Sequence, residues 1–368
     1  MTEESIFPVR KDIAAAEPYG APHPDVPVRL NVNENPYPPP PEVVESILAR
    51  VGAAAQGANR YPDRDFLELR SALGDYLLRE AAVPNVTADM IWAANGSNEV
   101  MLHLMQAFGG PGRRVCSFEP SYSMYPEYAR NTFTTWCPGK READFSLDAG
   151  RAIAHIDRTE PTIVLLASPN NPTGASLALP TIEAIAKHVE RQAIVVVDEA
   201  YAEFRRPGTA SAVQLLDKFR HVVVTRTMSK AFAFAGVRLG YLAADPELVG
   251  YLRTVRLPYH LSAITQATAL AALDHAGLML AQVTDLRERR DRLAAALTTM
   301  GFETAESDAN FVLFGRFEDR DAAWNKLLAK GVIVRQVGPP GWLRVSVGTE
   351  AETLAFLRAL AQIREELQ

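Results

Sequence analysis

Residues in the middle of the chain have the types and spacing to hold a carbonyl compound and a phosphate group. Ser229 precedes Lys230, and Arg238 follows eight residues after the lysine, between Gly236 and Gly240. A lysine amine can form a Schiff base with an aldehyde, and a cationic environment lowers its pKa for that role. The serine hydroxyl and the guanidinium suit one phosphate. A surface lysine and arginine would explain either residue alone, but they explain the combination much less well.

An acid and a tyrosine stand upstream, at the end of an expected strand. Asp198 and Tyr201 follow the apolar run 195–197. A carboxylate at the end of a buried strand needs a cation, and a protonated pyridine nitrogen is one. That pairing would keep a ring protonated as an electron sink, and Tyr201 could reach the ring's phenolic oxygen. An acidic helix cap followed by a packing tyrosine explains these two residues equally well.

Three further segments add candidate groups that are weak signals by themselves. Ser97 and Asn98 follow a strand and open a helix, whose exposed amides could bind a phosphate. Tyr122 could stack on a planar ring, although a core or surface tyrosine is the commoner explanation. Asn171 lies in a loop rich in proline and glycine, and it could donate to a phenolic oxygen or belong to a simple turn.

The expected elements around these residues alternate between strands and helices. Short β-rich runs are expected at 90–94, 114–118, 162–167, 193–197 and 221–225. Valine runs without alternation, such as 222–224, are typical of strands buried on both faces of a parallel sheet. Helical stretches such as 179–191 lie between them. The pattern predicts an α/β fold, whose ligand sites lie at the carboxyl ends of the strands.

Two domains and an N-terminal arm are expected. Residues 1–40 predict an extended arm and the start of a small domain, because five prolines between 36 and 41 exclude a helix or a central strand. Residues 41–260 are expected to form the large domain. Residues 261–368, with long alanine-rich helices and two short strands, predict a smaller α+β domain. We expect a long helix, rather than a flexible tether, to join the domains.

Composition argues against several other classes of protein. The chain has 368 residues, of which 48% are apolar and 22% charged, as in ordinary globular proteins. Because the net charge is −6, a broad basic face for nucleic acid is not expected. Two cysteines make neither a disulfide framework nor a metal cluster, and they fit a reducing compartment. Without a signal peptide or a spanning apolar run, a cytoplasmic location away from membranes is expected.

Together, these motifs resemble those of the fold-type I pyridoxal-phosphate (PLP) aminotransferases. Asn-Pro-Thr-Gly at 171–174, Asp-x-x-Tyr at 198–201, Ser-Lys at 229–230 and the later arginine occur in that family's order, and the match covers nearly the whole chain. The resemblance implies that Lys230 binds the cofactor and shuttles protons, and that Asp198 pairs with the pyridine nitrogen. It also implies roles for Tyr201 and Asn171 at the phenolic oxygen, Tyr122 on the ring, and Ser97, Asn98, Ser229 and Arg238 at the phosphate.

N-terminal segments narrow the resemblance to histidinol-phosphate aminotransferases, particularly actinobacterial ones. The matching segments are Pro-Tyr-Gly at 18–20, Leu-Asn-Val-Asn-Glu-Asn-Pro-Tyr at 30–37 and Asn-Arg-Tyr-Pro at 59–62. The resemblance implies a homodimer in which Tyr61 reaches across to the cofactor phosphate of the other subunit. It implies substrate-binding roles for Tyr19, Asn35, Arg335 and Arg344, with Arg344 at a carboxylate and Arg335, beside Tyr19, near the substrate's phosphate.

Two positions depart from the family pattern. Many relatives have an acid where Asn98 stands, but backbone amides could still hold the cofactor phosphate, so we expect that site to remain. The turn after Arg335 reads Gln336-Val337 in place of a version with proline. The pocket for the substrate's phosphate is therefore less well determined than the cofactor pocket.

The resemblance implies a reaction of histidine biosynthesis. An amino group would move between L-histidinol phosphate and 2-oxoglutarate, giving imidazole-acetol phosphate and glutamate by double displacement. An aromatic amino-acid aminotransferase of the same fold is the nearest alternative, and a PLP-dependent decarboxylase of threonine phosphate is a second. A PLP-sensing DNA-binding regulator is disfavoured, because the proline-rich N-terminal segment is too short for a helix-turn-helix module.

Overall fold

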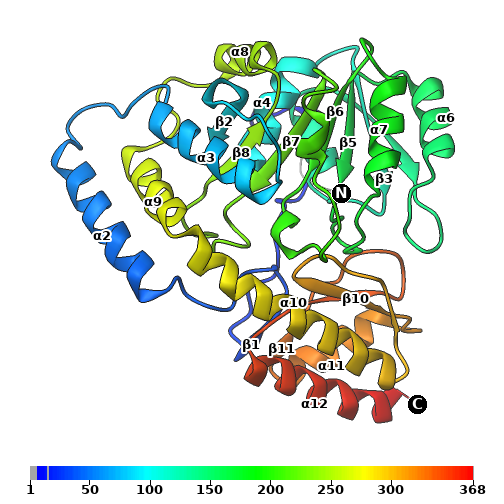
Figure 1. Ribbon diagram of the computed structural model, residues 1–368. Coiled ribbons are helices and arrows are strands. Elements are labelled where there is room, and N and C mark those ends of the chain that lie inside the picture. Colours follow the sequence, from blue (N-terminus) through cyan, green and yellow to red (C-terminus); the bar gives the residue numbers. More distant parts are fainter. Residues whose placement is uncertain (1–5, 15, 368) are drawn as a thin grey trace.

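A seven-stranded mixed sheet forms the centre of the large part of the molecule (Figure 1). The structure is a computed structural model that describes residues 6–14 and 16–367. The strand order is β2-β8-β7-β6-β5-β3-β4. The strands are β2 (Ile91–Ala94), β3 (Arg114–Glu119), β4 (Thr135–Lys140), β5 (Ile163–Ala167), β6 (Ile194–Asp198), β7 (Val222–Thr227) and β8 (Gly240–Ala243). Strands β3 to β7 are parallel and β8 is antiparallel to both neighbours, which confirms the expected mostly parallel sheet.

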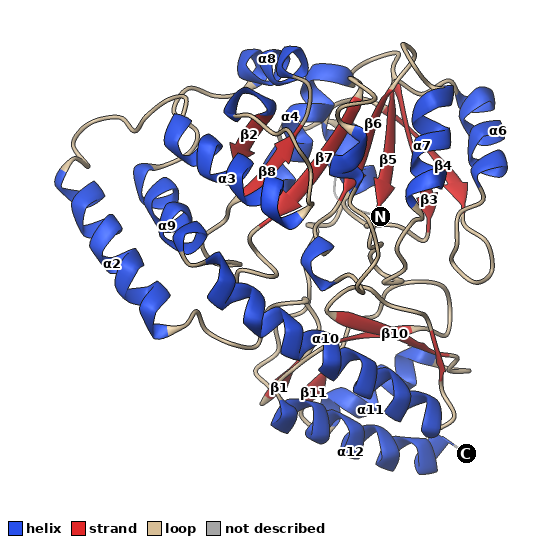
Figure 2. Cartoon of the chain, in the orientation of Figure 1, coloured by secondary structure: helices blue, strands red, loops and turns tan. Residues whose placement is uncertain are grey.

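The central strands are apolar because helices cover both faces of the sheet (Figure 2). Every residue of β5, β6 and β7 is buried, as the unbroken apolar runs predict. Two strands of this sheet were not predicted. β4 is an edge strand that contains Pro138 and Gly139, residues that an edge position tolerates and that hide the strand pattern. β8 has four residues, which is too short to show a periodicity.

Helices and short 3₁₀ turns connect these strands. The helices of this part are α2 (Pro41–Gln56), α3 (Leu67–Glu80), α4 (Ser97–Phe108), α5 (Tyr125–Asn131), α6 (Ala149–Thr159), α7 (Leu179–His188), α8 (Pro246–Val255) and α9 (Ala263–Asp274). The 3₁₀ turns are η1 (Ala88–Met90), η2 (Ala202–Phe204) and η3 (Ala212–Leu215). Side chains of Asp148, Asp245 and Ser262 cap α6, α8 and α9, which satisfies amides that a helix start leaves free.

A smaller sheet organises the second part of the molecule. In it, β10 (Phe311–Gly315) lies between the antiparallel strands β12 (Leu343–Ser346) and β9 (Glu303–Thr304). Two helices, α11 (Arg320–Ala329) and α12 (Glu350–Leu367), share one hydrophobic core with this sheet. A separate parallel pair joins β1 (Val28–Arg29) to β11 (Val332–Ile333). The segment around β1 therefore belongs with the C-terminal elements, far away in the sequence.

One long helix, α10 (Ala276–Thr299), runs from one part to the other (Figure 1). Its residues Val283 and Leu286 belong to the large core, whereas Leu293 and Leu297 belong to the small core. The preceding helix, α9, packs against α2 and α3 of the large part. We therefore propose that the domains meet within α10, which is later than the expected start of the small domain at residue 261.

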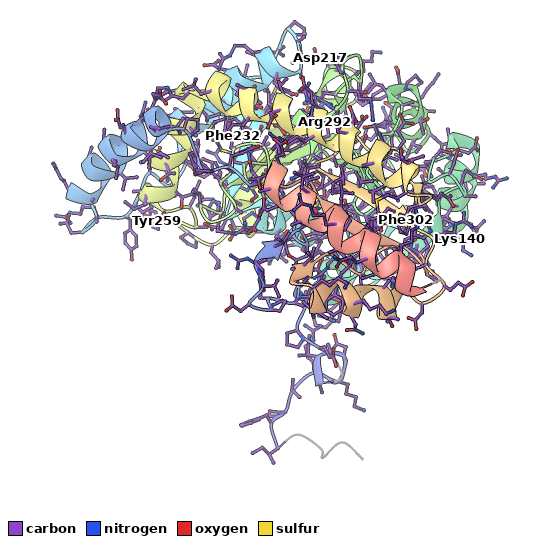
Figure 3. The ribbon with its side chains drawn as sticks, turned by 90° about the horizontal axis from the view of Figure 1, so that it is seen from below. Lys140, Asp217, Phe232, Tyr259, Arg292 and Phe302 are labelled. Carbon is purple, nitrogen blue, oxygen red and sulfur yellow. The ribbon has the colours of Figure 1, made fainter. Side chains whose placement is uncertain are left out.

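The described part of the expected N-terminal arm begins at residue 6, since residues 1–5 and 15 lie outside the described residues. It includes the short helix α1 (Lys11–Ala14) and projects from the body of the molecule (Figure 3). Within residues 6–14 and 16–367, no helix has the length and apolarity needed to cross a membrane. The same residues contain no cluster of histidine, cysteine and acidic side chains that could hold a metal ion.

Candidate active site

The carboxyl ends of the parallel strands form one wall of a cavity of about 1010 Å³. The register places Ala167 beside Asp198 and Asp198 beside Thr225, so the loops that follow β5, β6 and β7 lie together. Most residues singled out in the sequence line this cavity. They are Tyr19, Ser97, Asn98, Tyr122, Asn171, Asp198, Tyr201, Ser229, Lys230, Arg238, Arg335 and Arg344.

Asp198 is a buried carboxylate at the end of β6. Its Oδ2 accepts a hydrogen bond of 2.9 Å from the Tyr125 hydroxyl, and its Oδ1 accepts one of 3.2 Å from Thr225. Burial raises the pKa of Asp198, and both hydrogen bonds act in the opposite direction. Among the described residues, no lysine, arginine or histidine forms an ion pair with it. The site therefore offers a buried anion that a cationic ligand atom could satisfy.

Lys230 follows β7 and donates from Nζ to the Val32 carbonyl oxygen at 3.0 Å. Desolvation lowers the pKa of Lys230 to about 8, and the nearby charges of Arg344 and Arg238 act in the same direction. Glu34 opposes this shift. Because a neutral amine is the nucleophilic form, the surroundings prepare this lysine to react with a carbonyl group near neutral pH.

A second group of residues forms a compact anion site at the start of α4. Gly96 has a φ of 82°, and α4 begins at the next residue, Ser97. The Arg238 guanidinium donates to Ser229 Oγ at 3.3 Å, and it lies so close to Gly96 that a Cβ there would be 2.5 Å from Nη2. A Cβ on Gly240 would lie 2.1 Å from the Ser97 amide nitrogen. Both glycines thus let an arginine and a strand approach a helix N-terminus, which favours a bound phosphate.

Asn98, the second residue of α4, is held by a neighbouring tyrosine. Its Oδ1 accepts a hydrogen bond of 2.9 Å from the Tyr128 hydroxyl of α5. The relation of α4 to α5 is therefore fixed by a polar contact at the cavity wall. Asn98 remains exposed on its other side, where it lines the cavity.

Tyr201 joins three segments at the cavity. Its hydroxyl accepts hydrogen bonds from Asn33 at 3.0 Å and from Asn171 at 3.5 Å. Asn171 in turn accepts a hydrogen bond from Arg344. Burial raises the pKa of Tyr201, so its hydroxyl stays protonated and can donate to a ligand oxygen. Tyr122 is half-buried and also lines the cavity.

Arg335 and Arg344 face each other across a short antiparallel bridge. Each backbone amide donates to the other residue's carbonyl at 2.9 Å, so the two side chains emerge side by side. Their guanidinium groups donate to the carbonyls of Gly20 and Asn31, and neither forms an ion pair among the described residues. Arg335 Nη1 and Arg344 Nε are buried without a partner. The pair is therefore suited to bind anionic groups of a ligand.

Two predicted site residues lie outside this cavity. The Asn35 side chain accepts a hydrogen bond of 3.0 Å from the Tyr37 amide, as in a turn, and its Nδ2 is buried without a partner. Tyr61 is 79% exposed and stacks on Tyr259, with ring centroids 4.4 Å apart. Tyr259 lies at the outer edge of the molecule (Figure 3). Tyr61 therefore does not line the cavity of its own chain.

Four residues that support the site were not predicted from the sequence. Tyr125 and Thr225 hold Asp198, Asn33 holds Tyr201, and Val32 accepts from Lys230. Asn33 lies in the segment 30–37 that the resemblance had already marked. Val32 acts through its backbone carbonyl, so its side-chain type gave no signal.

Comparison with known proteins decides the family. Residues 25–360 match the model of "Aminotransferase class I and II". The chain belongs to this family. It is 56% identical to histidinol-phosphate aminotransferase of Thermobifida fusca, over 96% of this chain and 95% of that protein. It is 50% identical to the protein of that name from Bifidobacterium adolescentis, over 97% of this chain and 95% of the relative.

Solved structures of aminotransferases share the fold. Histidinol-phosphate aminotransferase from Sinorhizobium meliloti, in complex with pyridoxal-5'-phosphate, matches with a TM-score of 0.87 at 22% identity, covering 99% of this chain and 100% of that one. Aspartate aminotransferase from Thermus thermophilus with maleate matches with a TM-score of 0.80 at 27% identity, covering 91% of each chain. The aminotransferase fold and family expected from the sequence are thereby confirmed.

Proposed function

We propose that this aminotransferase moves an amino group between L-histidinol phosphate and 2-oxoglutarate, with pyridoxal 5'-phosphate as cofactor. One observation carries the proposal: a single cavity holds a lysine of lowered pKa, a buried carboxylate with no cationic partner in the described part of the chain, and a helix N-terminus beside an arginine. Relatives that are named for this activity and match nearly the whole chain support the choice of substrate.

The residues present fit the cofactor. When bound, pyridoxal phosphate supplies an aldehyde for the lysine and a ring that takes up electrons. Its ring nitrogen would provide the cation that Asp198 lacks, and Tyr201 with Asn171 would hold its phenolic oxygen. Tyr122 would pack on the ring. The phosphate would be bound by Ser97, Asn98, Ser229 and Arg238.

Lys230 has two tasks in this proposal, the attachment of the cofactor and the movement of protons. The Lys230 amine, when free, would take the proton from the substrate's α-carbon, hold it on Nζ and later pass it on. A pKa of about 8 suits both directions near neutral pH, because neither form of the amine is strongly disfavoured. Lys230 is half-buried, which limits the access of water to its amine.

The substrates differ in their anionic groups, since histidinol phosphate has a phosphate whereas glutamate has two carboxylates. Arg344, next to Asn171 and the cofactor site, would bind a carboxylate. Arg335 would bind the phosphate together with Tyr19, which lines the same cavity and bonds to Ser123 at 2.9 Å. A role for Asn35 in substrate binding stays a prediction, because its side chain does not line the cavity.

The proposal includes a homodimer in which Tyr61 reaches the cofactor phosphate of the partner subunit. Exposed apolar side chains on α2, α3, α9 and the segment before α9 support it, since α2 and α3 pack against α9 and Tyr61 stacks on Tyr259. These side chains are Leu48, Leu67, Leu257, Tyr259 and Ile264. Water contact with so many large apolar groups in one region is unfavourable, and a second copy of the chain would cover them.

Mixing two defective variants tests this dimer. Lys230→Ala lacks the reactive lysine but keeps Tyr61, and Tyr61→Ala lacks the tyrosine but keeps the lysine. A mixed dimer contains one site with both residues, so activity should rise above that of either variant after joint refolding. Sedimentation should show a dimer for both parents. No gain in activity from confirmed mixed dimers would contradict the role of Tyr61.

The proposal also includes a cytoplasmic location, which the two free cysteines, Cys116 and Cys137, support. Fractionation of the cells that produce the protein tests it, with detection by an antibody. Recovery of the protein in the membrane or secreted fraction would contradict this part of the proposal.

An amino-donor assay tests the reaction itself. Purified protein loaded with pyridoxal phosphate receives histidinol phosphate, phenylalanine or tyrosine, and glutamate formation from 2-oxoglutarate is measured. We expect the highest kcat/KM for histidinol phosphate. Turnover of the aromatic amino acids alone would favour an aromatic amino-acid aminotransferase, and release of carbon dioxide from threonine phosphate would favour a decarboxylase. Lys230→Ala should abolish transfer and the visible absorption of the bound cofactor.

A further inference from the structure

Tyr125 touches the central acid of the site without lining the cavity. It is the first residue of α5 and is fully buried, and its hydroxyl donates to Asp198 Oδ2 at 2.9 Å. Its ring meets the Tyr122 ring edge-on, with centroids 5.6 Å apart and an interplanar angle of 86°. One residue thus contacts both the carboxylate and the aromatic side chain proposed to hold the cofactor ring.

The two oxygens of Asp198 are held from different elements. Thr225, on the neighbouring strand β7, donates to Oδ1 at 3.2 Å, while Tyr125 reaches Oδ2 from a helix that follows β3. A carboxylate with a single donor can still turn about its Cβ–Cγ bond. Two donors on opposite oxygens fix the plane of the group, and charge-assisted hydrogen bonds of this kind are the strong ones.

Tyr125 acts as the donor in this bond. Burial and the adjacent carboxylate both raise the pKa of Tyr125 well above its usual value, so the phenol keeps its proton. An Asp198 carboxylate in this place accepts but cannot donate while it is ionised. The hydrogen bond therefore stabilises the ionised acid, the form that a protonated ring nitrogen needs.

We propose that Tyr125 is a positioning residue for Asp198, which it holds ionised and correctly oriented toward the ring nitrogen of the cofactor. The inference rests on the proposed cofactor. Loss of the hydroxyl would leave Asp198 with Thr225 and the Ala200 backbone amide as donors, and a carboxylate that is less strongly ionised would bind the cofactor ring less tightly. The effect should appear in cofactor affinity and in kcat, and less in KM, because Tyr125 does not line the substrate cavity.

Tyr125→Phe tests the inference, because it removes one hydroxyl and keeps the ring. We expect loss of this hydrogen bond to raise the Kd for pyridoxal phosphate about tenfold, which corresponds to about 1.4 kcal/mol. The Kd is measured by fluorescence titration of the cofactor-free protein. Tyr241→Phe is the matched control, since Tyr241 is also buried but its hydroxyl has no hydrogen-bond partner among the residues that the structure describes. The control should leave Kd and kcat unchanged.

A double-mutant cycle separates positioning from general packing. On the Asp198→Asn background, Tyr125→Phe should change the Kd by less than about twofold, because its partner is already altered. The inference is overturned if the Tyr125→Phe variant has the wild-type Kd. It is also overturned if Tyr125→Phe raises the Kd by the same factor on the wild-type and Asp198→Asn backgrounds. If wild-type protein does not bind pyridoxal phosphate at all, the proposed function fails instead, so the two failures are distinguishable.

A second measurement does not depend on the folding of Tyr125→Phe. The protein is produced with 3-fluorotyrosine at position 125, which preserves the shape of the side chain and its hydroxyl. The fluorine resonance should move when pyridoxal phosphate is added to this protein. The same addition should move it much less on the Asp198→Asn background. Equal changes on both backgrounds would overturn the inference, because Tyr125 would then respond to the cofactor by a route other than Asp198.

Discussion

Removal of the Arg226 side chain should greatly destabilise the protein. Arg226 lies in β7, and its side chain is only 1% exposed. Its guanidinium lies 2.7 Å from a Glu199 oxygen, 2.9 Å from one of Glu80 and 3.3 Å from one of Glu203. We call these residues, together with Arg205, the buried charge cluster.

The magnitude follows from the charges that would be left behind. Arg226→Leu leaves three carboxylates with Arg205, which reaches Glu80 at 3.0 Å and Glu199 at 3.4 Å. Loss of one partner from a buried ion pair costs about 3–5 kcal/mol. Because a folded protein is more stable than its unfolded chain by only about 5–15 kcal/mol, this is a large fraction of the total.

The loss of stability caused by Arg226→Leu should be smaller at low pH than at high pH. Burial already raises the pKa of Glu203 in the presence of Arg226. Without the arginine, the carboxylates of the folded variant should bind protons still more readily than those of the unfolded chain. Protonation then favours the folded variant, so the difference in unfolding free energy from wild type should shrink between pH 8 and pH 5.

Urea unfolding of cofactor-free protein, followed by circular dichroism, measures this difference. All proteins are compared at one concentration, because association adds to apparent stability. Arg220→Leu is the control. Arg220 also forms two ion pairs, with Asp245 at 2.6 Å and Glu247 at 2.9 Å, but its side chain is 74% exposed, so water screens both pairs and they contribute little to stability. A loss at pH 8 no larger than that of the control, or a larger loss at pH 5, would refute the reasoning.

Three other outcomes can be measured. Gly240→Ala should raise the Kd for pyridoxal phosphate about tenfold or more, because its methyl group would lie 2.1 Å from the Ser97 nitrogen, whereas Gly250→Ala, with open space around it, should not. Burial lowers the pKa of His103 to about 4. Below about pH 6.5, His103 therefore binds a proton in the unfolded chain but stays neutral in the folded protein. The urea midpoint should therefore fall as pH drops from 6.5 to 4, and a His103→Phe variant that folds should show a smaller fall. In cofactor-free protein, pulse acetylation of Lys230 read by mass spectrometry should have its midpoint near pH 8; a midpoint near 10 would contradict its desolvation.

Sequence patterns predicted those parts of the fold in which local chemistry and position agree. The valine runs of β6 and β7 are buried on both faces, and unbroken apolar runs indicate that situation directly. β4 was missed because Pro138 is tolerated only by virtue of its edge position, which is a property of the assembled sheet. The packing of the first half of α10 against the large core was not predicted either. The sequence of a continuous helix does not indicate which core each half contacts.

The residues of the candidate site also differ in how far the sequence predicts them. Residues that carry reactive groups, such as Lys230 and Asp198, stand in recognisable motifs, and the structure brings them to one cavity. Their supporting contacts are different in kind. Tyr125 looks like an ordinary core tyrosine in the sequence, and Val32 contributes only a backbone carbonyl. Such partners become visible only when segments far apart in the chain are placed together.

The segment around β1 packs with C-terminal elements far away in the sequence, and this has a practical consequence for protein engineering. β1 pairs with β11, the Asn33 amide donates to Ser346 at 2.9 Å, and Asn310 donates to the Asn33 carbonyl at 3.0 Å. A chimaera that takes only the C-terminal third from a relative would combine half of this interface from each parent. A recombination scheme should therefore exchange the segment around residues 28–35 along with the C-terminal module, as one inherited unit.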